Sequence, residues 1–76
     1  MSALVEEVRQ ARRLPPRGVA KAIRVSAGIS QERMAEELAV HRSTVLRWEQ
    51  GQRRPRGRLL GAYSELLESL RAAVGE

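Results

Sequence analysis

The chain has 76 residues, no Cys and a formal net charge of +5. Residues 1–76 are expected to form one small domain, because a chain of this length has no room for a catalytic domain beside a binding domain. Without Cys there is no disulfide, thiolate metal site or thiol nucleophile, so a cytoplasmic protein is expected. The charged N-terminus is typical of neither a signal peptide nor a membrane anchor, and no apolar run approaches the roughly 18 residues that span a bilayer.

The basic residues suggest a polyanionic partner. Six Arg and one Glu lie in residues 41–58, so this segment alone carries as much positive charge as the whole chain. All basic residues except Lys21 are Arg. Two explanations of this bias stay open: a need for the planar, bidentate guanidinium group, or a GC-rich genome, whose codons favour Arg over Lys.

Apolar periodicity predicts an all-α chain of about five helices, without the alternating pattern of a strand. The expected helices span residues 2–13, 16–27, 30–39, 41–50 and 57–74. Ser2 and Ser30 suit N-caps, Pro15 and Pro16 end the first helix, and Pro16 suits the first turn of the second. Gly28 suits the left-handed residue that closes a helix. The expected fold is a compact helical bundle.

The last expected helix carries an apolar stripe about 120° wide. Its members are Leu59, Leu60, Tyr63, Leu66, Leu67, Leu70 and Val74. Part of the stripe follows the spacing of paired helices in a coiled coil. Two interpretations stay open: the stripe closes the core of the bundle, or it holds a second copy or another protein.

The third and fourth expected helices are short and joined by a tight turn, and the fourth is basic, which is the helix-turn-helix arrangement. On a helical wheel, an inward side holds His41, Thr44, Val45 and Trp48. The opposite side holds Arg42, Ser43, Leu46 and Arg47. We expect Trp48 in the core rather than stacked on a base, and His41 as a structural residue at the N-cap rather than a catalyst or metal ligand.

The side opposite Trp48 has the chemistry of a DNA base reader. Arg bonds O6 and N7 of guanine, Ser donates or accepts, and Leu contacts the methyl group of thymine. A major groove about 12 Å wide admits one such helix. The simpler alternative is a solvated basic face. The Arg-rich segment that follows suggests phosphate contacts, because four Arg within six residues repel one another unless they are neutralised.

Residues 23–55, IRVSAGISQERMAEELAVHRSTVLRWEQGQRRP, resemble the lambda-repressor and Cro-like family of helix-turn-helix domains, also called the XRE type. The matching positions are Arg24, Gly28, Ser30-Gln31, Met34-Ala35, Ser43-Thr44-Val45, Glu49-x-Gly51 and Arg53-Arg54-Pro55. Two positions depart from the pattern, because members usually have Gly where this chain has Ala39 and an apolar residue where it has Gly57. We therefore expect either a strain of roughly 1 kcal/mol at Ala39 or a slightly different turn.

The resemblance implies sequence-specific binding of double-stranded DNA by the helix over residues 41–50, in a bacterial or phage transcriptional regulator such as a repressor. Together with the helical wheel it assigns base reading to Arg42, Ser43, Leu46 and Arg47. The residues expected to contact phosphate are Gln31, Thr44, Arg53, Arg54, Arg56 and Arg58. It also implies a buried ion pair between Arg24 and Glu49.

Two alternatives are an antitoxin-type interaction module that also binds DNA and a phage excision or architectural factor, which would bend its site. RNA is disfavoured, because the deep A-form groove excludes a recognition helix and the chain has no Phe. No enzyme activity, cofactor or metal site is expected, since the sequence has neither a nucleophile with its base nor a metal-ligand cluster. A homodimer on a two-part operator and a protein partner through the last helix stay open.

Overall fold

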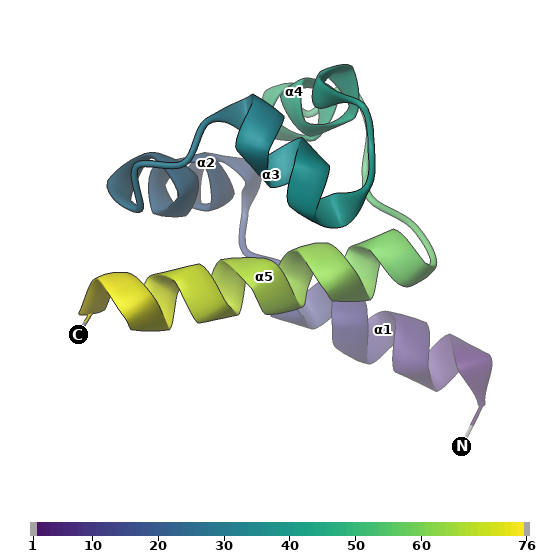
Figure 1. Cartoon of the computed structure of the whole chain (residues 1–76). Coiled ribbons are helices and arrows are strands. Elements are labelled where there is room, and N and C mark those ends of the chain that lie inside the picture. Colours follow the sequence, from purple (N-terminus) through teal and green to yellow (C-terminus); the bar gives the residue numbers. More distant parts are fainter. Residues whose placement is uncertain (1, 76) are drawn as a thin grey trace.

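A computed structural model describes residues 2–75 and forms five helices within them. They are α1 (Ala3–Arg13), α2 (Arg17–Ser26), α3 (Gln31–Leu38), α4 (Arg42–Gln50) and α5 (Arg58–Gly75). Figure 1 shows α2, α3 and α4 together above α5, while α1 lies below α5 and its N-terminal end projects away from the other helices. The expected all-α bundle is confirmed, and residues 2–75 contain no strand. None of the described helices combines the length and apolarity needed to cross a membrane.

All five helices begin one residue later than predicted, and in three of them the residue expected first caps the helix with its side chain. These N-caps are Ser2, Ser30 and His41. At the start of α3, for example, the Ser30 hydroxyl accepts the backbone N–H of Arg33 at 3.0 Å. Pro16 also lies outside its helix: it precedes α2 with an extended backbone instead of occupying the first turn.

The core lies between α5 and the three helices above it. Its buried apolar side chains are Ala20, Met34, Ala35, Leu38, Val45, Trp48, Tyr63 and Leu67. The rings of Trp48 and Tyr63 pack against each other with centroids 4.7 Å apart. Burial raises the pKa of Tyr63 to about 12, so its hydroxyl stays neutral at physiological pH. The expectation that Trp48 belongs to the core is confirmed.

Most of the apolar stripe on α5 is used by this core. Tyr63 and Leu67 are buried, and Leu59, Leu66 and Leu70 pack against the core as half-buried residues. Val74, near the C-terminal end of α5, is 51% exposed. Apart from Leu60, the stripe therefore closes the core as far as Leu70.

Ala39 closes α3 in the left-handed conformation, with φ 55° and ψ 43°. Its N–H donates to the carbonyl of Glu36 at 3.1 Å, and the N–H of Val40 donates to the carbonyl of Ala35 at 3.0 Å. These two bonds are the usual closure of a helix that ends in a left-handed residue. Of the two expectations for this turn, the strained one is therefore right.

Replacing Ala39 by Gly should stabilise the protein. We expect the free energy of unfolding to rise by about 0.5 to 1 kcal/mol, because Gly adopts a left-handed conformation without the steric cost paid by Ala. Thermal unfolding followed by circular dichroism would measure the change. The matched control is Ala72→Gly, at an exposed helical position of α5, where the same substitution should destabilise the protein by about 1 kcal/mol. A loss of stability in both variants would contradict the expected strain.

Candidate nucleic-acid interface

The four predicted base readers lie on one side of α4. They are Arg42 and Leu46 in one row and Ser43 and Arg47 in the next, each pair four residues apart. Arg42 and Arg47 are exposed, whereas Ser43 and Leu46 are half-buried rather than fully exposed. The other side of α4 is fixed in the core by Val45, which is 0% exposed, and by Trp48. One side of the helix is therefore packed in the core, and the other side exposes two guanidinium groups to solvent.

His41 is exposed, so its predicted inward position was wrong. The helical wheel does not apply to this residue, because its backbone is extended and precedes the first turn of α4. Its Nδ1 atom accepts the backbone N–H of Ser43 at 3.1 Å and lies 2.9 Å from the Ser43 hydroxyl. The donor and acceptor in this second contact are set by the tautomer of the imidazole ring.

Arg24 of α2 and Glu49 of α4 form a buried ion pair with two parallel hydrogen bonds. Nε of Arg24 donates to Oε2 of Glu49 at 2.6 Å, and Nη2 donates to Oε1 at 2.9 Å. The two side chains are 9% and 3% exposed. The remaining nitrogen, Nη1, donates to the backbone carbonyl of Ile29 at 2.7 Å. The pair therefore joins α2, α4 and the turn between α2 and α3.

The environment of this pair shifts the pKa of both side chains. Burial raises the pKa of the Glu49 carboxyl group, but the hydrogen bonds from Arg24 and Gln31 and the charge of Arg24 outweigh it, so the pKa is lower than its ordinary value. The hydrogen bond to Glu49 raises the pKa of Arg24 despite burial. Both groups therefore stay charged at neutral pH.

Gln31, the predicted phosphate clamp, contacts the same carboxylate. Its Nε2 atom donates to Oε1 of Glu49 at 3.0 Å. Sequence reasoning gave Gln31 and the ion pair separate roles, whereas the structure places them in one network. This network connects the N-terminus of α3 to α4 and fixes the two helices of the helix-turn-helix relative to each other.

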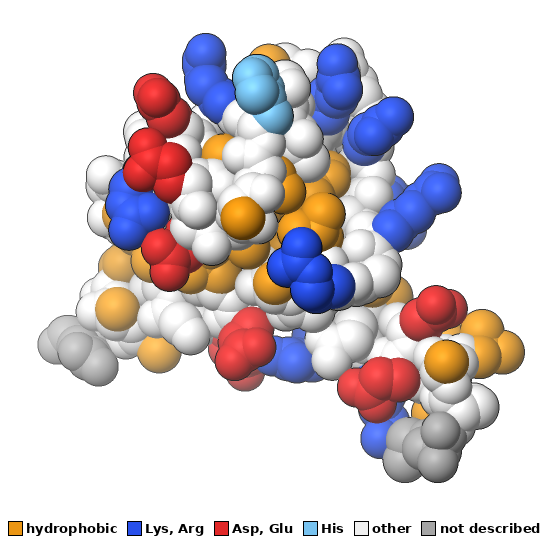
Figure 2. Space-filling model, turned by 45° about the vertical axis from the view of Figure 1, so that its right-hand side comes forward, with side chains coloured by type: hydrophobic (Ala, Val, Ile, Leu, Met, Phe, Trp, Pro, Cys, Tyr) orange, Lys and Arg blue, Asp and Glu red, His pale blue; other side chains and the backbone are white. Residues whose placement is uncertain are grey.

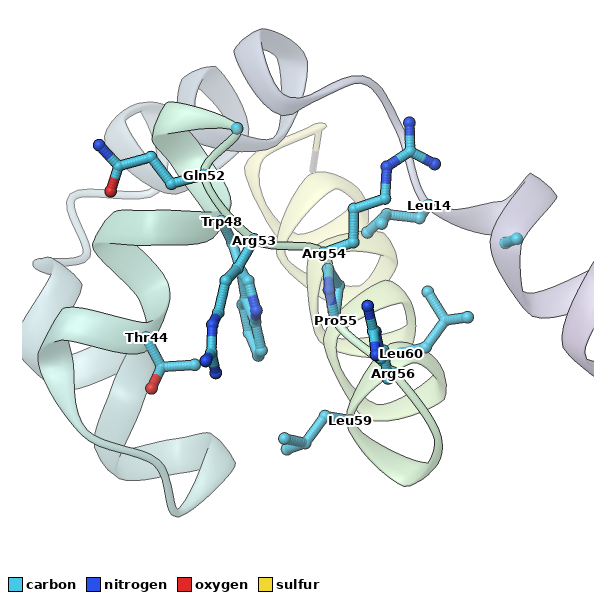
Figure 3. A pocket seen from close by; sticks show the side chains of 12 residues that line it. Leu14, Thr44, Trp48, Gln52, Arg53, Arg54, Pro55, Arg56, Leu59 and Leu60 are labelled. Atoms are coloured by element: carbon cyan, nitrogen blue, oxygen red, sulfur yellow. The ribbon is translucent and has the colours of Figure 1, made fainter.

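The basic loop between α4 and α5 borders a groove of about 810 Å³. The groove has a rim of Thr44, Arg53, Arg54 and Arg56 and apolar walls that include Leu14, Trp48, Leu59 and Leu60. In Figure 3 the Arg53 side chain extends beside Trp48 towards Thr44, whereas Arg54 points the other way, to the side where Leu14 lies. Arg58, the first residue of α5, is exposed and does not line the groove.

Charge is unevenly distributed over the surface. Figure 2 shows Lys and Arg side chains without acidic neighbours along the upper right of this face, while at the upper left and along the lower part Asp and Glu side chains lie beside Lys and Arg side chains. The upper part belongs to the helices above α5 in Figure 1. No cluster of His, Asp and Glu within residues 2–75 is suited to hold a metal ion. The arrangement is suited to binding an extended anion.

Sequence reasoning missed Arg17, which holds the end of α4. Its Nη1 atom donates to the backbone carbonyl of Gln50 at 3.1 Å. Gly51, with φ 75°, closes α4, and a side chain at this position would overlap the guanidinium group of Arg17. A cation at a helix C-terminus also interacts favourably with the helix dipole. Nothing in the local pattern marked Arg17, because a basic residue after a Pro pair has no specific meaning.

Two short helices that meet at a left-handed turn, the second with an exposed basic side, define a helix-turn-helix protein. A family model described as helix-turn-helix matches residues 21–71, which is more than half of the chain. The chain belongs to this family, the XRE-type domains that resemble lambda repressor and Cro. No curated protein and no solved structure matches the chain. All of α1 lies outside the matched residues.

Proposed function

We propose that the protein is a sequence-specific transcriptional regulator of a bacterium or phage, that it acts as a repressor in the cytoplasm, and that α4 enters the major groove of double-stranded DNA. The observation that carries this proposal is the pair of exposed guanidinium groups, Arg42 and Arg47, on a helix whose opposite side is held by Val45 and Trp48. Membership of a DNA-binding helix-turn-helix family supports it. No enzyme activity is part of the proposal.

Each side chain of this surface has a distinct part in base reading. Arg42 and Arg47 donate to O6 and N7 of guanine, and Leu46 contacts a thymine methyl group. The Ser43 hydroxyl, which donates or accepts, contacts a neighbouring base edge.

The phosphate contacts come from both ends of the helix-turn-helix. The amide nitrogen of Gln31 has two hydrogens, and the bond to Glu49 uses one, which leaves the other for a phosphate at the N-terminus of α3. The other phosphate contacts are those of Thr44 in the first turn of α4 and of Arg53, Arg56 and Arg58 after α4, whereas Arg54 points away from Thr44, to the side of Leu14 (Figure 3). Such contacts set the position of the protein on the duplex but do not select sequence.

A base reader and a phosphate contact should fail in different ways when replaced by Ala. We expect Arg42→Ala to lose about 1 to 3 kcal/mol of binding free energy on the preferred site and to relax the preference at one base position. Arg53→Ala should weaken binding to all duplexes similarly and lower the slope of log K against log salt by about one. Selection from a random duplex library, followed by salt titrations on the selected site, would measure both effects.

The control for these variants is Arg71→Ala, an exposed Arg on α5 that is far in sequence from the helix-turn-helix. Its base preference and salt slope should match those of the parent protein. If Arg42→Ala and Arg53→Ala show the same base preferences and the same salt slope, the proposed division between base and phosphate contacts is wrong. If no sequence is enriched by the parent protein, the proposed function itself fails.

We further propose that two copies bind a two-part operator. One recognition helix contacts only a few base pairs, and strong specificity usually comes from two half-sites about 34 to 36 Å apart, one turn of the DNA helix. Footprinting at saturation should then show two protected segments about one helical turn apart, on the same face of the DNA. A single short footprint would argue for a monomer.

A further inference from the structure

The helix α1 contacts α5 through polar side chains and turns its apolar side to solvent. Arg13 forms an ion pair of 2.7 Å with Glu68, and the side chain of Gln10 lies next to Gly61. Away from these contacts, Leu4, Val5 and Val8 are 69%, 42% and 48% exposed. An amphipathic helix in a monomer normally buries its apolar side. The family fold leaves α1 outside its matched residues, so that fold does not explain the exposed side.

The exposed apolar side of α1 continues into a basic groove. Ala11 and Leu14, at the C-terminal end of α1, line the groove of about 810 Å³ described above and a second one of about 530 Å³. Arg54 borders both grooves. This end of α1 therefore offers an apolar surface with a cationic edge.

The N-terminal half of α1 is acidic and apolar, which complements the basic and apolar surface at the C-terminal end. Glu7 lies four residues before Ala11 and seven before Leu14, so it shares their row on the helix surface. It is exposed and forms no ion pair with the described residues. Next to it lie the exposed apolar side chains of Leu4 and Val8. One end of α1 is therefore acidic and apolar, and the surface at its other end is basic and apolar.

We propose that α1 is a dimerisation arm that pairs antiparallel with α1 of a second copy. In this arrangement Leu4 and Val8 of each copy cover the groove beside Leu14 of the other, and each Glu7 meets Arg54 of the other. A two-fold axis makes both contacts at once, as in any isologous interface. The two ends of one helix are thus the two halves of a self-complementary surface.

The interface is small, because α1 has only 11 residues. We expect it to bury less than the total of about 1,200 Å² found in stable complexes, so self-association should be weak, with a Kd in the micromolar to millimolar range. A weak dimer suits a protein that pairs on DNA. The proposal does not depend on any DNA contact, and its test contains no DNA, so its failure would leave the proposed function standing.

Charge reversal at the two ends gives a specific test. Sedimentation velocity of the full chain over a range of concentrations should show a reversible monomer–dimer equilibrium. Glu7→Arg places two like-charged contacts in the homodimer, and so does Arg54→Glu, so each variant alone should associate about tenfold more weakly. An equal mixture of the two variants should form heterodimers, because both contacts then join opposite charges. Native mass spectrometry separates such heterodimers from homodimers by mass.

The matched controls are Glu65→Arg and Arg71→Glu, which make the same charge changes at exposed positions of α5. They should associate as the parent protein does. A chain that stays monomeric at millimolar concentration would overturn the proposal. A dimer that withstands both single reversals, or a mixture that forms no heterodimer, would also overturn it and would place the interface elsewhere, for example at the exposed end of α5.

Discussion

Glu49→Ala should lower the free energy of unfolding by about 3 to 5 kcal/mol, because the substitution leaves the buried guanidinium group of Arg24 without its counter-charge. It also removes the acceptor of the Gln31 amide. In a domain of this size such a loss corresponds to a fall in Tm of about 12 to 40 °C. Urea and thermal unfolding followed by circular dichroism would measure it.

The control for Glu49→Ala is Glu65→Ala, at an exposed position of α5, where the change should stay within about 0.5 kcal/mol. The double variant Arg24→Met with Glu49→Leu should be far more stable than Glu49→Ala, since an apolar pair leaves no charge buried. A loss below about 1 kcal/mol in Glu49→Ala would show that the pair contributes no more than a surface ion pair.

The lowered pKa of Glu49 adds a pH dependence to this comparison. A carboxyl group whose pKa is lower in the folded state stabilises the protein above its unfolded pKa of about 4.3, and this contribution is lost as the pH falls through the folded pKa. The stability difference between the parent protein and Glu49→Gln should therefore be constant near neutral pH and shrink in acid.

Trp48→Ala should also cost about 3 to 5 kcal/mol of stability, because it removes the largest side chain of the core and its packing against the Tyr63 ring. Chemical unfolding followed by circular dichroism is the suitable measurement, since Trp48 is the only Trp and the variant loses its fluorescence. Trp48→Phe, which keeps an aromatic ring, should lose less.

The stability of Trp48→Ala also distinguishes the two roles considered for this residue. As a core residue, Trp48 should affect DNA affinity only through the folded fraction, so affinity corrected for that fraction should stay close to the parent value. If Trp48 stacked on a base instead, the Trp48→Ala variant would keep nearly the same stability and would lose about 1 to 3 kcal/mol of DNA-binding free energy. Val74→Ala, at a half-exposed position of α5, controls for the loss of apolar surface alone.

The fold could be predicted from the sequence because its signals are local. Pro15 and Pro16, the Ser N-caps and the apolar periodicity each act within a few residues, and they placed every helix end within one position. The ion pair between Arg24 and Glu49 was expected from a resemblance, since 25 residues separate the partners and no local rule connects them.

The parts of the site that escaped prediction depend on contacts between helices. A helical wheel gives the direction in which a side chain points but not how much of it the rest of the protein covers. Ser43 and Leu46 were therefore expected to be exposed, although both are half-buried. The bond from Gln31 to Glu49 and that from Arg17 to Gln50 follow from the angles between helices, which periodicity does not determine. For the same reason, the amphipathic pattern of α1 did not show which of its sides contacts α5.

Arg17 also gives α4 a mechanical connection to α1. The last residue of α1 is Arg13, and Pro15 and Pro16 lead from it to Arg17, whose guanidinium group holds the carbonyl of Gln50. Proline fixes φ, so the two prolines restrict the backbone between α1 and Arg17. The C-terminal end of α4 is therefore held by a residue that lies only four positions after the end of α1, outside the residues that the family model matches.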